Sequence, residues 1–185
     1  MSAATLAGAP TDTRQRLIEA ATALFIRHSF AGTSLQMIAD AVGVTKAAIY
    51  HQFNTKEAIL VGVLEVNLHD IEAALVVAET TPQGEDGRAR LLEQVLRVAV
   101  SQRRAIGTLQ NDPAFVRLLG EYEPSQRLWT RLFSTLLGSD LNTSARVRAA
   151  ALSAAIGSVG HPFVAEIADD ELYRELLTLT RDLLS

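Results

Sequence analysis

The chain has 185 residues, of which 48% are hydrophobic and 21% charged, a composition typical of a soluble globular protein. It contains no cysteine, which excludes disulfides, thiolate metal sites and cysteine nucleophiles and fits a cytoplasmic location. Residues 1–56 carry five basic and three acidic side chains, whereas residues 57–185 carry twelve basic and eighteen acidic ones. The first part of the chain is therefore slightly basic and the remainder is acidic.

The start of the chain shows no targeting or membrane segment. Residues 1–10 are small and uncharged and are expected to form a disordered lead-in, without the basic region and apolar run of a secretory signal. No apolar run approaches the roughly 18 residues that a membrane helix needs, so no membrane association is expected. The first helix should begin at a cap on Thr11 or Asp12 and end at "SFAGTS", where Gly32 is the expected turn residue.

Capping residues in the next 25 residues predict a pair of short helices joined by a tight turn, followed by a long helix. Thr33 followed by Gln36 matches a capping box, and Gly43 suits the left-handed residue that ends a helix. Thr45 can cap the next helix, and Asn54 or Thr55 can cap a long one over residues 56–79. Residues 34–53 therefore predict a helix-turn-helix. Its expected core is Ile38, Ala39, Val44, Ile49 and Phe53.

The rest of the chain also has helical spacing, interrupted by short breaks rich in glycine, proline and asparagine. Helices are expected near residues 88–104, 113–119, 124–138, 143–159 and 169–184. The prediction is an all-α protein of about nine helices, with a first domain over residues 11–71 and a second over residues 72–185.

Catalytic and metal-binding patterns are absent from the sequence. The four histidines lie in different segments without the spacing of a metal site, and no Gly-x-Ser-x-Gly or phosphate-binding glycine loop is present. No enzyme activity, metal or cofactor is therefore expected.

The segment "TSLQMIADAVGVTKAAIYHQFNTKEAIL" (33–60) resembles the DNA-binding head of the TetR family of bacterial one-component regulators. The matching positions are Thr33, Ile38, Ala39, Gly43, Val44, Thr45, Tyr50, Phe53 and Lys56. The resemblance covers roughly residues 12–70; His51 and Gln52 depart from the usual pattern. It implies a cytoplasmic transcriptional regulator, most simply a repressor, that binds a palindromic operator as a homodimer and is released by a small-molecule effector. The alternative is a ligand-independent DNA-binding or protein-interaction regulator with the same head.

Proteins with this motif place the second short helix in the major groove of double-stranded DNA. Lys46 in its first turn can reach guanine or a phosphate, and Ala47 and Ala48 can contact a thymine methyl group. The Tyr50 hydroxyl and the Lys56 ammonium are candidate phosphate ligands. The remaining candidates for DNA contact are Thr33, Ser34, Gln36, Thr45, His51 and Gln52. The alternatives are that both lysines are solvated surface charges and that Tyr50 only packs.

The resemblance also implies that the later helices bind a ligand and form the dimer. Small residues on one helix and leucines on the last one predict a four-helix interface, whose candidates are Ala149, Ser153, Gly157, Leu172, Leu176 and Leu179. The alternative is that the leucines pack inside the monomer. Ligand-binding candidates are Asn67, Gln102, Arg103, Phe115, Tyr122, Trp129 and Phe133, although aromatic residues at helical spacing are more often core residues.

Overall fold

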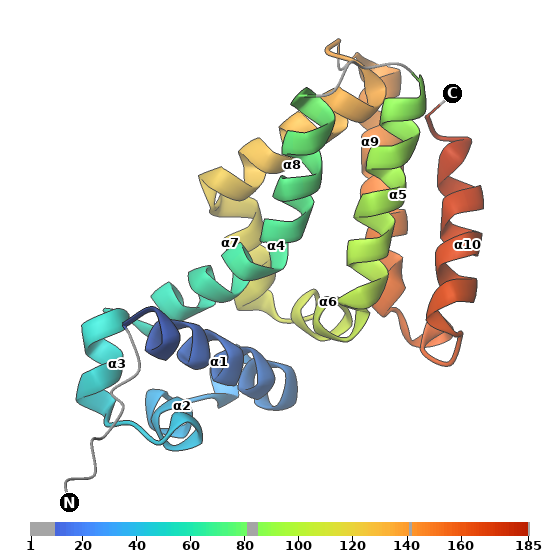
Figure 1. The fold of residues 1–185 in the computed structure, drawn as a ribbon. Helices are drawn as coiled ribbons and strands as arrows, with labels where there is room; N and C mark the ends of the chain where they lie inside the picture. The colour runs from blue at the N-terminus through green and yellow to red at the C-terminus, as the bar shows by residue number, and fades with distance from the viewer. Residues whose placement is uncertain (1–9, 81–84, 141, 185) are drawn as a thin grey trace, which may run out of the picture. The chain divides into compact units, whose positions relative to one another are not determined.

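The computed structural model describes residues 10–80, 85–140 and 142–184, and this part of the chain forms ten α-helices, two short 3-10 helices and no strand (Figure 1). The predicted all-α class is confirmed. Most of the predicted lead-in, residues 1–9, lies outside the described residues. The chain divides into two compact units, Met1–Glu65 and Val66–Ser185, called here the first and second units. The structure thus divides the chain six residues before the predicted boundary.

The first unit contains α1 (Pro10–Gly32), α2 (Leu35–Val42), α3 (Lys46–Gln52) and the start of α4 (Lys56–Thr80). α1 begins at Pro10, ahead of the predicted caps, and proline with its fixed φ suits a first helical position. The core joins the apolar stripe of α1 to the helix-turn-helix; its buried residues include Leu17, Ile18, Phe25, Ile38, Ala39, Ile49 and Phe53. Val44, predicted to be core, is only half-buried.

The turn between α1 and α2 lies in the predicted segment "SFAGTS" but differs in the residue that breaks the helix. The helical path breaks at Ser29, with φ 63° and ψ 168°, rather than at Gly32. This region of backbone space costs a residue other than glycine about 1–3 kcal/mol, so surrounding contacts must hold it. Thr33 supplies one such contact, because its hydroxyl donates to the Ser29 carbonyl at 2.8 Å.

The second unit combines the rest of α4 with six further helices: α5 (Glu85–Ser101), α6 (Arg103–Leu109), α7 (Pro113–Glu121), α8 (Glu123–Leu137), α9 (Thr143–Gly157) and α10 (Asp169–Arg181). Helices α5, α8, α9 and α10 pack around one core, and α10 lies against both α5 and α9 (Figure 1). The fully buried residues of that core include Leu92, Val95, Leu96, Leu132, Leu136 and Leu152.

Helix α6 was not predicted, because residues 88–104 were expected to form one helix. Instead, α5 ends at Ser101, and α6 begins after Gln102, which has φ −101° and ψ 8°. α6 packs closely on the 3-10 turn Ser158–Gly160. At this crossing a Cβ atom on Gly107 would lie only 2.4 Å from the Gly160 carbonyl oxygen. Two glycines far apart in the sequence therefore allow the contact.

Candidate nucleic-acid interface

The turn between α2 and α3 is fixed by its own backbone and by side-chain caps. Gly43 has φ 75°, as predicted, and its N–H donates to the Ala39 carbonyl at 2.9 Å. The Thr45 hydroxyl accepts from the Ala48 N–H at 3.2 Å, which confirms Thr45 as the cap of α3. These contacts fix the angle at which α3 leaves α2.

Helix α3 has one buried and one exposed side. Ile49 is fully buried and Phe53, just after the helix, is 4% exposed, so both anchor α3 in the core of the first unit. Tyr50 is 48% exposed, so about half of this residue is accessible to a partner. The exposed side chains, called here the recognition face, are Lys46, Ala47, Tyr50 and His51, with Ala48 and Gln52 half-buried at its edges.

The predicted capping box is wrong in its first residue. Ser34, not Thr33, caps α2, because its hydroxyl accepts from the Met37 N–H at 3.2 Å. Thr33 is only 2% exposed, which removes it from the set of DNA contacts. Gln36 is exposed, and its amide donates to Asp40 one turn later at 2.7 Å. Ser34 and Thr45 keep a free O–H donor, since each cap uses only an oxygen lone pair.

Three of the basic side chains in the first unit contact other parts of that unit. The Arg14 guanidinium lies 4.9 Å from the centre of the Phe53 ring and 3.9 Å from the Glu65 carboxylate. Arg16 donates to the carbonyl of Val42, the last residue of α2, at 2.9 Å. A cation suits this position because carbonyl oxygens at the end of a helix lack helical partners.

Lys56, predicted to bind phosphate, has partners inside the first unit. Its ammonium donates to the carbonyls of Phe30 at 2.8 Å and Thr33 at 2.9 Å. It also lies 4.2 Å from the centre of the Phe30 ring. The sequence placed this lysine correctly at the start of α4 but gave no sign of these partners, which lie 26 and 23 residues earlier.

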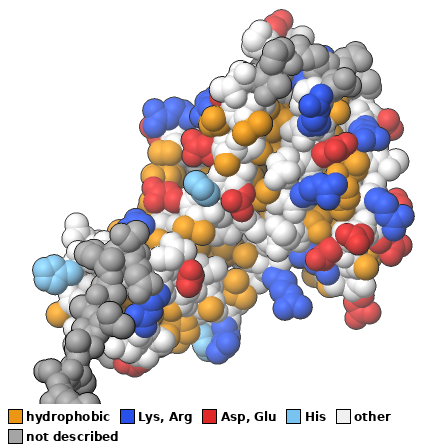
Figure 2. Space-filling model, viewed as in Figure 1, with side chains coloured by type: hydrophobic (Ala, Val, Ile, Leu, Met, Phe, Trp, Pro, Cys, Tyr) orange, Lys and Arg blue, Asp and Glu red, His pale blue; other side chains and the backbone are white. Residues whose placement is uncertain are grey.

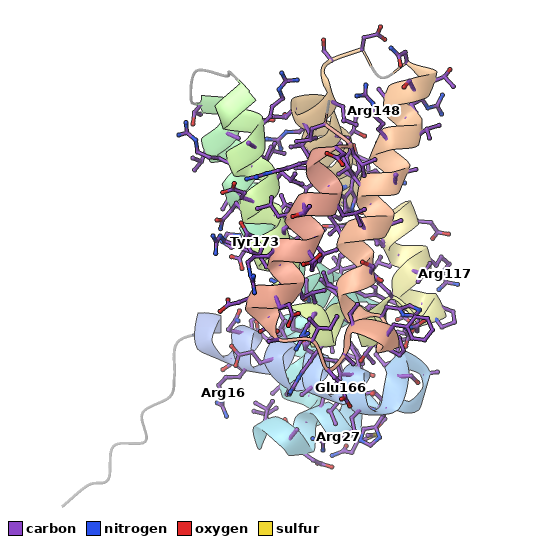
Figure 3. The ribbon with its side chains drawn as sticks, turned by 90° about the vertical axis from the view of Figure 1, so that its right-hand side faces the viewer. Arg16, Arg27, Arg117, Arg148, Glu166 and Tyr173 are labelled. Atoms are coloured by element: carbon purple, nitrogen blue, oxygen red, sulfur yellow. The ribbon has the colours of Figure 1, made fainter. Side chains whose placement is uncertain are left out.

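The two other basic side chains of this unit are Lys46 and Arg27. Neither makes a hydrogen bond, ion pair or ring contact with the described residues of the chain. Arg16 and Arg27 are both on α1 and are labelled in Figure 3. Arg27 lies outside the predicted helix-turn-helix and was not among the predicted DNA contacts, but it is exposed on α1.

The predicted ligand-binding residues line neither of two clefts in the second unit. A cleft of about 730 Å³ in the second unit lies between α4 and α5, and none of the predicted residues lines it. Phe115 is buried, and Trp129 stacks on Phe133 at 6.0 Å against the core. Arg103 has a structural role, since its guanidinium donates to the Ile167 carbonyl at 2.8 Å and pairs with Asp169 at 2.9 Å.

The α4–α5 cleft has walls of different character. The α4 wall consists mainly of small apolar residues: Ala73, Ala74, Val77 and Ala78. The α5 wall contributes Arg90, Gln94 and Arg97, with Asp70 of α4 also in the lining. The guanidinium of Arg97 lies 4.4 Å from the centre of the Tyr173 ring on α10, a residue labelled in Figure 3. Figure 2 shows apolar and basic side chains intermixed on the surface of the second unit.

The predicted dimer residues differ in exposure. Leu172 and Leu176 are 3% and 5% exposed and pack into the core of their own unit, so their assignment to an intermolecular surface is wrong. Leu179 is 60% exposed. On α9, Ser153 is exposed and Ala149 and Gly157 are half-buried; Ser153 and Gly157 line a second groove beside α6.

No helix in the described ranges has both the length and the apolar character needed to cross a membrane. The same part of the chain holds no group of three or more side chains suited to bind a metal ion. A helix-turn-helix with an exposed second helix, joined to a separate helical unit, is typical of DNA-binding transcriptional regulators. Residues 17–63 match the family model described as "Bacterial regulatory proteins, tetR family". This match identifies a TetR-type DNA-binding domain in the first unit.

Sequence relatives over part of the chain support this assignment. A 61-residue segment is 39% identical to the HTH-type transcriptional regulator SrpR of Pseudomonas putida, and an 87-residue segment is 33% identical to TtgR of the same species. These segments cover 33% and 47% of this chain but only 29% and 41% of the two relatives.

A fold match extends along most of the chain. NalD, the secondary repressor of the MexAB-OprM multidrug efflux pump in Pseudomonas aeruginosa, has a TM-score of 0.70 at 21% identity. The match covers 94% of this chain and 97% of NalD. A regulator from Aquifex aeolicus also has a TM-score of 0.70, at 18% identity over 92% of this chain and 99% of its own. At such identities these likenesses concern the fold.

Proposed function

We propose that this protein is a transcriptional repressor that binds a palindromic DNA operator as a homodimer and releases it when a small molecule binds. The observation that carries the proposal is the recognition face, where polar and small side chains are exposed on a short helix anchored by Ile49 and Phe53. The repressor role is supported by the match of residues 17–63 to the TetR family model and by relatives whose names describe regulators and repressors.

Three exposed residues of α3 have roles suited to their chemistry. Lys46, in the first turn, reaches guanine O6 and N7 or a neighbouring phosphate. Ala47 permits close approach and contacts a thymine methyl group, and the Tyr50 hydroxyl donates to a phosphate. The free hydroxyl donors of Ser34 and Thr45 add further phosphate contacts.

A homodimer is required because one recognition helix reads too few base pairs to select a site in a genome. The proposed surface joins exposed residues of α9 and α10, including Val147 (64% exposed), Ala150, Ser153, Ala154 and Leu179. Small residues let a second helix approach, and a two-fold axis would make this patch contact its own copy. The two copies of α3 would then read half-sites about 34–36 Å apart, or a multiple of that distance.

The α4–α5 cleft is the proposed effector site. Its volume is within the range of ligand pockets, and it combines apolar walls with a few polar groups. By linkage, an effector that weakens DNA binding must itself bind more weakly to the DNA complex, by the same factor. Calorimetric titration of a compound found by thermal-shift screening, with and without DNA, measures this factor. Equal affinities in the two titrations would instead favour a ligand-independent regulator.

The DNA-binding proposal is tested by selecting duplexes from a randomised library with the purified full-length protein. The expected result is an enriched palindrome. Lys46→Ala should change base preference at one or two positions in each half-site, or reduce affinity for every sequence if Lys46 contacts only phosphate. Arg104→Ala, at an exposed position in the second unit, is the control and should bind as the wild type does. Recovery of no enriched sequence by the wild-type protein would refute the proposal.

A further inference from the structure

We infer that Lys56 is a positioning residue that holds α2, and through it the recognition helix α3, rather than a ligand of the DNA phosphate. The expected effect of Lys56 on DNA affinity rests on the proposed DNA-binding function. The support that Lys56 gives to α2 is inferred only from contacts within the first unit.

The contacts of Lys56 use most of its hydrogen-bonding capacity. A lysine ammonium has three N–H donors, and two point to the carbonyls of Phe30 and Thr33 at 2.8 and 2.9 Å. The Phe30 ring, 4.2 Å from the nitrogen, adds a cation–π contact, and that ring packs on Phe25 at 5.4 Å. A phosphate could take a second hydrogen bond from this ammonium only by displacing one of the carbonyls.

The position of these carbonyls explains why the contact matters for α3. Thr33 directly precedes Ser34, the cap of α2, so fixing the Thr33 carbonyl fixes the start of that helix. Arg16 holds the other end of α2 through the Val42 carbonyl at 2.9 Å. Because Gly43 joins α2 to α3 through one tight turn, an error in the placement of α2 moves the recognition face.

The turn also needs external support. Ser29 has a positive φ, which side chains other than glycine rarely adopt, and Phe30 and Thr33 follow it directly in the same turn. The turn's own contacts are the Thr33 hydroxyl on the Ser29 carbonyl and the Gly32 N–H on the Ser29 hydroxyl. Lys56 is the side chain that ties this turn to α4, and therefore to the core of the first unit.

The test compares Lys56→Met with Lys46→Met in the full-length protein. Each substitution keeps an unbranched apolar stem and removes one positive charge. The first measurement is hydrogen–deuterium exchange without DNA, over the amides of residues 30–38. The second is affinity for a mixed-sequence 30-base-pair duplex as a function of salt.

For Lys56→Met we expect exchange in the turn to accelerate by about tenfold or more, because two charge-assisted hydrogen bonds are lost. DNA affinity should fall, while the slope of log affinity against log salt should change by much less than the 0.9 expected for a lost phosphate contact. For Lys46→Met we expect amide exchange in the turn to stay unchanged. The slope of log affinity against log salt should be reduced by about 0.9 if Lys46 contacts phosphate. A Lys56→Met protein with unchanged exchange and a slope reduced by about 0.9 would overturn the inference.

Phe30→Leu supplies a second variant in case Lys56→Met does not fold. It removes the ring beneath the ammonium but no candidate DNA contact, so it should also accelerate exchange in the turn and weaken DNA binding without changing the salt slope. Unchanged exchange and unchanged binding would contradict the inference. If the wild-type protein binds no DNA even at low salt, the proposed function fails, and the exchange measurements alone decide the role of Lys56.

Discussion

Replacing Gly107 by alanine should destabilise the second unit. The added Cβ would lie 2.4 Å from the Gly160 carbonyl oxygen and 2.9 Å from the Gly160 Cα, whereas ordinary contacts begin at 3.4 Å. Both obstructing atoms belong to the backbone, so α6 and the turn at residues 158–160 must separate by about 1 Å. A gap of that size forfeits about a quarter to a half of the dispersion energy of the atoms affected. Overpacking of this kind costs about 1–3 kcal/mol, more than the small gain in helix propensity from alanine.

Urea denaturation followed by circular dichroism measures this loss in free energy of unfolding. Gly120→Ala is the matched control, because Gly120 is also in a helix, its φ is not positive, and an added Cβ would meet no atom within 4 Å. The control should gain about 0.5–1 kcal/mol from helix propensity. If Gly107→Ala is as stable as the wild type while the control behaves as expected, the two backbones are not in contact and the packing of α6 described above is wrong.

Three other substitutions probe contacts described above. Arg103→Met should lower the free energy of unfolding by about 1–3 kcal/mol in urea denaturation, because it leaves the Ile167 carbonyl and Asp169 without their cation. Leu179→Asp, at an exposed position, should reduce self-association in sedimentation without loss of helicity, whereas Leu176→Asp should unfold the second unit; equal effects would contradict the assignment. Thr33→Val should cost about 1 kcal/mol of stability through the lost hydrogen bond to Ser29 and leave the salt dependence of DNA binding unchanged.

The parts of the fold that the sequence predicted are those set by neighbouring residues. Gly43 ends α2 with a positive φ, and Thr45 and Thr55 cap the helices that follow them, because each acts on backbone groups within a few positions. Helical periodicity likewise located the apolar stripe of α1 and the anchors Ile49 and Phe53. Local chemistry is therefore enough to define the helix-turn-helix.

The errors concern contacts between distant residues. Lys56 reaches carbonyls 26 and 23 positions away, and Arg103 reaches one 64 positions away. A basic residue near a helix end looks the same in sequence whether it faces DNA, solvent or a carbonyl. The leucine spacing of α10 also could not distinguish a dimer surface from the core, and the structure places Leu172 and Leu176 in the core.

Because several basic side chains of the first unit contact other residues of that unit, DNA binding should depend only moderately on salt concentration. Arg14, Arg16 and Lys56 have partners inside the first unit, which leaves Lys46 and Arg27 as the candidates for phosphate neutralisation. A dimer would offer two copies of each, so the slope of log affinity against log salt should not exceed about 3.6 in magnitude. Neutral donors such as the Tyr50 hydroxyl add hydrogen bonds without adding to this slope. Fluorescence anisotropy between 50 and 200 mM salt measures it. A slope steeper than about 5 would show that an internal cation leaves its partner when DNA binds.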